Sequence, residues 1–141
     1  MIAVPLALLF IAVVCDLRSR DIPDALSLLM LAWAAVVVVC SANGWNPGGL
    51  TWGGAVAGLG IGFALAFPLF ALGGLGGGDV KLIAALGAAV GPLLLLQTLF
   101  WTAIAGGLIA FVVKLRGQKD FAYVPAIFAG LIGALVLSPY F

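Results

Sequence analysis

The chain alternates between long apolar segments and short polar or glycine-rich ones. Apolar residues fill most of it, and polar or turn-forming residues cluster at 16–24, 41–51, 73–79 and 114–120. A helix that crosses a bilayer needs about 20 consecutive, mostly apolar residues, and the segments between these clusters approach that length. The pattern therefore predicts six membrane-spanning helices, over about residues 1–15, 25–40, 52–72, 80–95, 97–113 and 121–137.

Turn residues mark where these helices begin and end. Pro23 suits the first turn of the second helix, because a proline lacks only an N–H that would be unpaired there. Gly91 and Pro92 predict a bend between the fourth and fifth helices, whose division the pattern places near residue 96. The glycine-rich segment 73–78 breaks the helical pattern before the fourth helix.

The third apolar segment repeats small residues at helical spacing. Gly54, Gly58 and Gly62 follow one another every four residues, and Ala66 continues the series. Small residues at this spacing let two helices approach closely in a membrane. We therefore interpret the glycines as a packing surface and not as a nucleotide-binding motif, since no strand–turn–helix unit surrounds them.

Composition makes the bilayer the solvent of the whole chain. Of 141 residues, 65% are hydrophobic and 8% are charged. Soluble domains have about a quarter of their residues charged. Six spans leave no room for a separate soluble domain, so we expect a single all-α integral membrane domain over residues 1–141. The net charge of +1, with six Lys plus Arg, argues against nucleic acid as a partner.

The distribution of charge predicts the orientation in the membrane. Every Lys and Arg falls in 16–24, 73–81 or 114–120, and the loops that face the other side contain none. Basic loops stay in the cytoplasm, so we expect a multi-pass protein of the inner (plasma) membrane with both termini outside. The five acidic residues share the cytoplasmic face; they are Asp16, Asp21, Asp24, Asp79 and Asp120.

The titratable side chains restrict the possible chemistry. The chain has no histidine, and its two cysteines, Cys15 and Cys40, end different apolar segments. Ordinary zinc sites and histidine-based triads are thereby excluded, and we expect neither a metal nor a cofactor. Aspartates remain as the only strong acid–base groups.

The aspartates differ in how well a structural role explains them. Asp120 lies beside Lys119 in a polar segment and is expected to be solvated. Asp21 and Asp24 stand at the start of a helix, where capping is favoured over catalysis. Asp16 ends the first apolar segment, where the helix dipole disfavours an anion, so no structural role explains it.

Asp79 is compatible with either an N-cap or a catalytic role. The glycines before it remove side chains where another backbone, such as that of a peptide substrate, must come close. Two aspartates that meet have the groups of an aspartic protease, in which one carboxylate activates water and the other, protonated, polarises the scissile carbonyl. The alternative from a different class is a small proton-coupled transporter or a structural membrane subunit, which would favour acids near the midplane.

Two segments of the sequence resemble the signature segments of a known family. Asp16-Leu-Arg-Ser-Arg-Asp-Ile-Pro-Asp24 and Gly76-Gly-Gly-Asp79-Val-Lys81-Leu are similar to those of the type IV prepilin peptidases, the GxGD class of membrane aspartic proteases. Tyr123-Val-Pro-Ala-Ile-Phe-Ala-Gly130 is similar to the segment of the family's final helix. The resemblance covers essentially the whole chain. It implies a catalytic pair and four supporting motif residues, which are Asp16 with Asp79 and Gly76, Gly78, Lys81 and Pro23.

The resemblance also implies the substrate and the limits of the activity. The expected partner is a prepilin-like protein with a hydrophobic helix, cut at the cytoplasmic face. Longer members carry paired CxxC motifs and are also N-methyltransferases, whereas this short form predicts cleavage without methylation. It resembles the enzymes of Flp-type, tight-adherence pili and also archaeal preflagellin peptidases, and the sequence leaves that choice open, as it does the oligomeric state. Asp24 departs from the family, which usually has Asn there.

Two neighbouring carboxylates are expected to share one proton, because both cannot ionise cheaply at short range. Lys81 and the start of the fourth helix favour ionisation of Asp79. The sequence therefore assigns the proton to Asp16.

Overall fold

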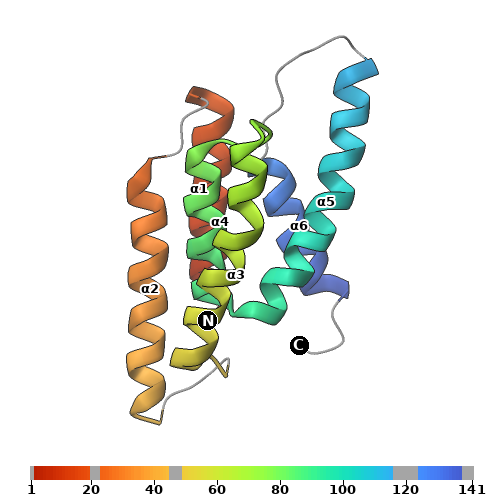
Figure 1. Cartoon of the computed structure of the whole chain (residues 1–141). Coiled ribbons are helices and arrows are strands. Elements are labelled where there is room, and N and C mark those ends of the chain that lie inside the picture. The colour runs from red at the N-terminus through yellow and green to blue at the C-terminus, as the bar shows by residue number, and fades with distance from the viewer. Residues whose placement is uncertain (1, 20–22, 45–48, 116–123, 138–141) are drawn as a thin grey trace.

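The computed structural model describes residues 2–19, 23–44, 49–115 and 124–137. Within these ranges the chain forms six helices and no strand, which confirms the all-α prediction (Figure 1). The helices are α1 (Ala3–Ser19), α2 (Asp24–Ala42), α3 (Trp52–Ala71), α4 (Gly77–Val90), α5 (Pro92–Leu115) and α6 (Val124–Leu137).

Successive helices run in opposite directions along one bundle. In Figure 1, α1, α3 and α5 rise and α2, α4 and α6 descend. The end of the bundle where α1 finishes and α2 and α4 begin carries most of the charged residues of the described helices. We call it the polar end; it includes Asp16, Arg18, Asp24, Asp79 and Lys81.

Helix α4 is the centre of the bundle. It contacts α1, α2, α3 and α5, and every residue from Asp79 to Val90 except Lys81 is buried. Such all-round burial explains why its sequence is apolar on every side. Side chains on every face of α4 therefore contact neighbouring helices.

Helices α3 and α4 meet along the small residues that the sequence singled out. Gly58, Gly62 and Ala66 are buried on α3. A Cβ at Gly58 would overlap the Gly87 carbonyl of α4, and one at Gly62 would lie 2.8 Å from the Ile83 carbonyl oxygen. The packing interpretation is therefore confirmed for Gly58 and Gly62, and Ala66 is buried on the same helix. Gly54 lies outside the contact, next to the Thr51 side chain that caps α3.

Several helix boundaries differ from those the sequence predicts. Helix α4 starts three residues earlier, at Gly77, and ends at Val90 instead of 95. Gly91, with φ of +83°, separates it from α5 in a conformation that side chains disfavour, and Pro92 begins α5. Hydropathy alone misses this division because both flanking segments are apolar. Helix α1 extends past Cys15 to Ser19, so Asp16 lies inside it.

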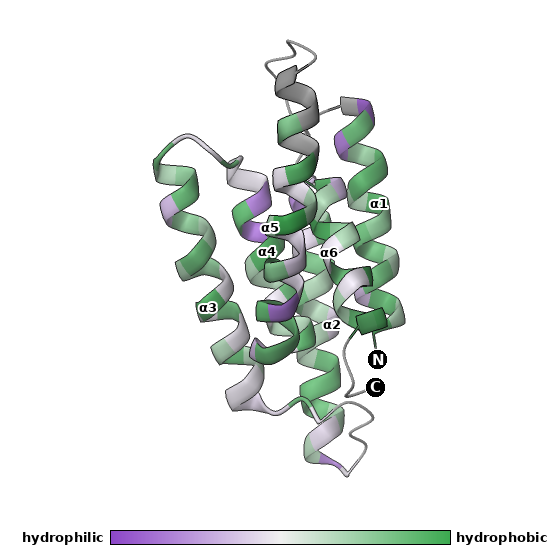
Figure 2. Ribbon diagram, turned by 90° about the vertical axis from the view of Figure 1, so that its right-hand side faces the viewer, coloured by the Kyte–Doolittle hydropathy of each residue, from purple (hydrophilic) through white to green (hydrophobic). Residues whose placement is uncertain are grey.

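Two of the helices, α2 and α3, are long and apolar enough to cross a membrane. Only 33% and 17% of their apolar windows are buried, whereas the core helix of a soluble protein would be mostly buried. Large apolar side chains are also exposed on other helices, among them Phe10 and Leu17 of α1 and Phe100 and Leu108 of α5. In Figure 2 hydrophobic residues fill most of each helix. Helices α4 and α6 have 14 residues each, fewer than the predicted spans of about 20. The structure thus supports two spans by length and composition.

Candidate active site

Asp16 lies near the end of α1 on the side that faces the bundle. Its exposed fraction is 9%, and α1 contacts both α4 and α6. The Oδ2 atom is buried and has no hydrogen-bond partner within the described part of the chain. Burying a carboxylate oxygen without a partner is costly, so packing does not explain the presence of this residue.

Asp79 is the third residue of α4, and its exposed fraction is also 9%. The Gly76 N–H donates a hydrogen bond to its Oδ2 atom over 3.3 Å, as in a capping box. The Oδ1 atom is buried without a partner among the described residues. The N-cap of α4 is thus Gly76 and not Asp79, which the sequence allowed as the N-cap. The hydrogen bond from Gly76 accounts for one oxygen of Asp79, and the other is left for a different function.

The environment of Asp79 favours its protonated form. Burial raises the pKa of this carboxyl above its ordinary value, and the charge of Asp16 raises it further, while the Gly76 hydrogen bond lowers it. Asp79 precedes the apolar segment that starts at Val80. The burial of Asp79 thus favours the opposite assignment to the expected one, with the shared proton on Asp79 and not on Asp16.

The two motif glycines occupy different positions around Asp79. Gly76 is the N-cap of α4, and a Cβ there would lie 3.2 Å from Asp79 Oδ2, tighter than usual contact. A glycine at 76 therefore lets the carboxyl approach its backbone. Gly78 lies in the first turn of α4 and is half-buried. Gly73 makes the turn out of α3, with φ of +74°.

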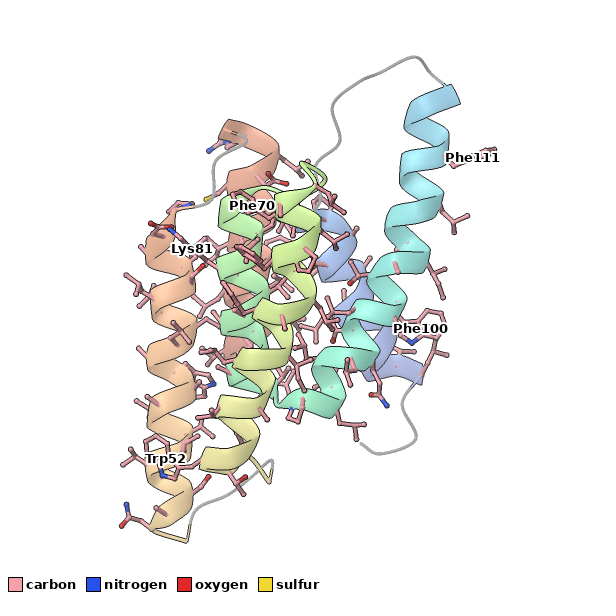
Figure 3. The ribbon with its side chains drawn as sticks, in the orientation of Figure 1. Trp52, Phe70, Lys81, Phe100 and Phe111 are labelled. Carbon is pink, nitrogen blue, oxygen red and sulfur yellow. The ribbon has the colours of Figure 1, made fainter. Side chains whose placement is uncertain are left out.

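Lys81 pairs with an aspartate that the sequence assigned to capping. Its Nζ donates to both carboxylate oxygens of Asp24, at 2.8 and 2.9 Å, and so joins α4 to α2 (Figure 3). Pro23 is the N-cap residue of α2, one position before the first turn in which the sequence placed it, and it makes no side-chain cap. The helix begins at Asp24, one residue before the predicted start. Asp24 lies in the first turn, where the dipole favours an anion. Nothing in the sequence pattern predicted this pairing. Asp21 and Asp120 lie outside the described residues.

The polar end thus holds two buried carboxyl groups, those of Asp16 and Asp79. The pKa of Asp79 is raised, so this group keeps its proton to a higher pH than an ordinary aspartate. An ionised carboxylate next to a protonated carboxyl can act as base and acid in one reaction. Asp24 and Lys81, by contrast, are exposed and neutralise each other. The arrangement supports acid–base chemistry at Asp16 and Asp79 and assigns a structural contact to the other pair.

Comparisons with known proteins agree on one family. The family model described as the type IV leader peptidase family matches residues 3–111. The chain is 31% identical over 132 residues to a protein of Bacillus subtilis (strain 168) named prepilin leader peptidase/N-methyltransferase. That match covers 90% of this chain and 51% of the relative, so the chain spans about half the relative's length. No solved structure matches the chain.

Proposed function

Because this chain belongs to the type IV leader peptidase family, we propose that it is a membrane-embedded aspartic endopeptidase that removes the leader peptide of prepilin-like substrates. The observation that carries the proposal is the pair of buried carboxyl groups at the polar end, each with an oxygen that has no partner in the described chain. Family membership supports a peptidase over the transporter or structural subunit that the acids alone allowed.

The proposed reaction uses the two aspartates in different protonation states. Ionised Asp16 takes a proton from a water molecule, whose oxygen attacks the carbonyl carbon of the scissile peptide bond. Protonated Asp79 donates to the carbonyl oxygen, which forms a gem-diol. Asp16 then returns its proton to the leaving nitrogen, the C–N bond breaks, and Asp79 recovers its proton as the new carboxyl group forms. The raised pKa of Asp79 supports its assignment as the acid.

The proposed setting is a bundle of six membrane spans with the polar end at the cytoplasmic face. The antiparallel order of the helices supports this orientation, because it brings Arg18 and Lys81 to one end and starts α1 at the other. The short helix α4 fits such a bundle since its neighbours shield it from lipid. Both termini would then lie outside.

The proposed substrate is a prepilin-like protein with a hydrophobic helix, either a Flp-type pilin or an archaeal preflagellin. We propose cleavage without methylation, although the Bacillus relative carries both activities in its name. In support, Cys15 and Cys40 lie near opposite ends of the bundle, so the chain forms none of the cysteine pairs that the resemblance attributes to methylating members. The cysteines also offer no shared metal site.

Co-expression tests the proposed activity. The chain is produced together with a candidate Flp-type prepilin, and loss of the leader is scored as a mobility shift on a gel. We expect cleavage that depends on the chain. An unprocessed prepilin, in cells where both proteins accumulate in the membrane fraction, would contradict the proposal.

The pH dependence of cleavage should be bell-shaped. On the acidic side the rate falls once both carboxyl groups of the pair are protonated, because no base then remains. On the alkaline side it falls as Asp79 loses its proton, at a pH above the ordinary aspartate value of about 3.9, because its pKa is raised. Initial rates from pH 4 to 9 in detergent would measure the profile. A rate that only rises with pH would rule out a protonated Asp79.

Chelators should leave cleavage unchanged. The carboxyl pair activates water by itself, and a chain without histidine has no ordinary zinc site. Cleavage rates are compared before and after incubation with EDTA. Loss of activity that one added metal restores would overturn the metal-free mechanism.

A further inference from the structure

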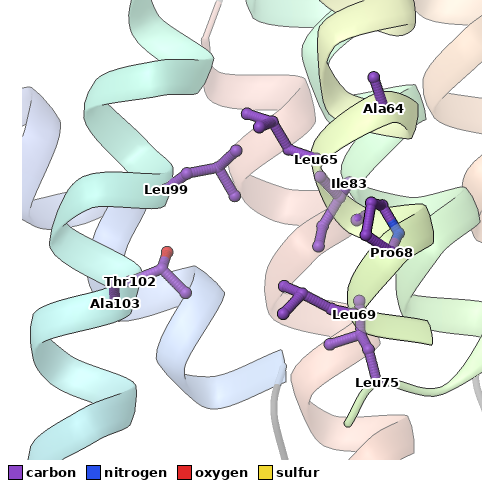
Figure 4. A pocket seen from close by; sticks show the side chains of 10 residues that line it. Ala64, Leu65, Pro68, Leu69, Leu75, Ile83, Leu99, Thr102 and Ala103 are labelled. Carbon is purple, nitrogen blue, oxygen red and sulfur yellow. The ribbon is translucent and has the colours of Figure 1, made fainter. Parts of the chain in front are cut away.

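Helix α3 lines several apolar cavities, and two of them reach toward the polar end. The larger, of about 420 Å³, opens between α3 and α5 and is lined by Leu65 and Leu69 on one side and Leu99 and Thr102 on the other (Figure 4). We call it the lateral groove. The second, of about 320 Å³, lies between α2 and α3, and Asp24 and Lys81 line it.

The lateral groove is the one that shares a face of α4 with Asp79. Ile83 lines the groove and follows Asp79 by four residues on α4. At 3.6 residues per turn, the two side chains leave the helix in directions that differ by about 40° around its axis. Leu75, in the loop just before α4, lines the groove as well. The groove therefore runs toward the buried carboxyl groups at the polar end.

The second cavity belongs to the opposite side of α4. Lys81 lies about 200° from Asp79 around the helix, and Ala84 and Ala85 line this cavity with it. Gly62 packs on Ile83 and Ala84, so α3 separates the two cavities. A chain segment seated in the second cavity would lead to the Asp24–Lys81 pair instead of to Asp79.

Ala64 and Pro68 place a backbone acceptor of α3 at the wall of the lateral groove. Pro68 lies inside α3 and has no N–H, so the Ala64 carbonyl lacks its usual helical donor, and both residues line the groove. An acceptor without a donor is costly in an apolar setting, and a donor from a bound segment would satisfy it.

These observations rest on different residues and agree, and we propose that the lateral groove seats the hydrophobic helix of the prepilin-like substrate. The inference rests on the proposed function and identifies where that substrate binds. The substrate helix lies between α3 and α5 and contacts Leu99 and Leu65, with its polar end next to Leu75. The peptide bond that precedes the helix then reaches Asp79 and Asp16.

Photo-crosslinking tests where the substrate helix binds, with two neighbouring positions on α5 and one on α2. Benzoylphenylalanine replaces Leu99, in the groove, or Phe100, whose side chain is 62% exposed and points away from the bundle, as Figure 3 shows. Leu28, in the second cavity, is the third position. Each variant of the full chain also carries Asp79→Asn, so that the prepilin stays uncleaved. The variants are irradiated in membranes that contain the prepilin.

We expect the crosslink to the substrate helix from position 99 to exceed those from 100 and 28 by about tenfold. Equal crosslinks, a stronger crosslink from 28, or capture of lipid alone at 99 would overturn the placement. Cleavage by the chain without the probe is measured in parallel. If cleavage occurs and the crosslink at 99 is absent, the groove assignment fails while the peptidase proposal stands; without cleavage, the proposed function itself fails.

Filling the groove provides a second readout. Ala64→Trp places a large ring in the groove, and Ala57→Trp is its control, since Ala57 lies two turns away on the same side of α3 and outside both cavities. We expect Ala64→Trp to raise KM for full-length prepilin about tenfold with little change in kcat, and Ala57→Trp to do neither. A leader peptide without the helix should be cut equally by both variants. An unchanged KM in Ala64→Trp, with normal accumulation, would contradict the proposal.

Discussion

Asp79→Asn or Asp16→Asn is expected to reduce leader cleavage by at least about 100-fold, because one positioned acid or base contributes about 10²–10⁴-fold to a rate. An amide keeps the shape of the carboxyl group but neither takes the proton of water nor supplies an acidic one. Both side chains are buried at the polar end of the bundle, so no other described carboxyl group replaces them. The measurement is the initial rate of leader loss per unit of membrane-inserted protein.

Asp120→Asn is the control for these variants. Asp120 lies beside Lys119 in a polar segment, away from both signature segments, and its amide variant should cleave within about twofold of wild type. Protein accumulation is measured for all three variants. Full activity in Asp16→Asn or Asp79→Asn would contradict the assignment of the catalytic pair.

Gly58→Val is expected to lower accumulation of the folded protein strongly, and more than Asp16→Asn or Asp79→Asn. A Cβ at this position would overlap the Gly87 carbonyl of α4, and neither backbone can yield without separating α3 from α4. Overpacking against side chains costs about 1–3 kcal/mol, and a backbone contact gives less room for relief, so we expect about 3 kcal/mol or more. Fluorescence-detected size-exclusion chromatography in detergent gives the folded yield.

Gly60→Val is the matched control for Gly58→Val. It adds the same side chain to the same helix, but a Cβ at Gly60 meets no atom within 4 Å. Its cost is limited to helix propensity, so accumulation should stay near wild type. Equal losses in the two variants would show that the close approach of α3 and α4 does not determine stability.

The sequence predicted the number of helices and the end of the bundle where the acids gather. Both follow from the spacing of the polar segments, since each helix reverses the direction of the chain. It also predicted the contact surface of α3, because glycines at every fourth position have few other uses in an apolar helix. The sequence also singled out Asp16, as an anion at the unfavourable end of a helix, and the structure buries this side chain.

The remaining features depend on which helices surround α4. Its residues are apolar in every direction, so no periodicity indicates which face meets α1, α3 or α5. The burial that raises the pKa of Asp79 and the pairing of Lys81 with Asp24 both follow from that arrangement. Pro68 is the one signal for the lateral groove that the sequence contains, as a proline within an apolar helix.

The most direct test of the proposed peptidase is the intact mass of the products made by the purified chain. The full chain, reconstituted in lipid vesicles with a purified Flp-type prepilin, should convert it into a leader and a mature protein whose masses sum to that of the prepilin plus one water. The mature protein should carry no added methyl group, and the Asp79→Asn chain should leave the prepilin intact. An unchanged prepilin mass with the folded wild-type chain, or the same products from Asp79→Asn, would contradict the account.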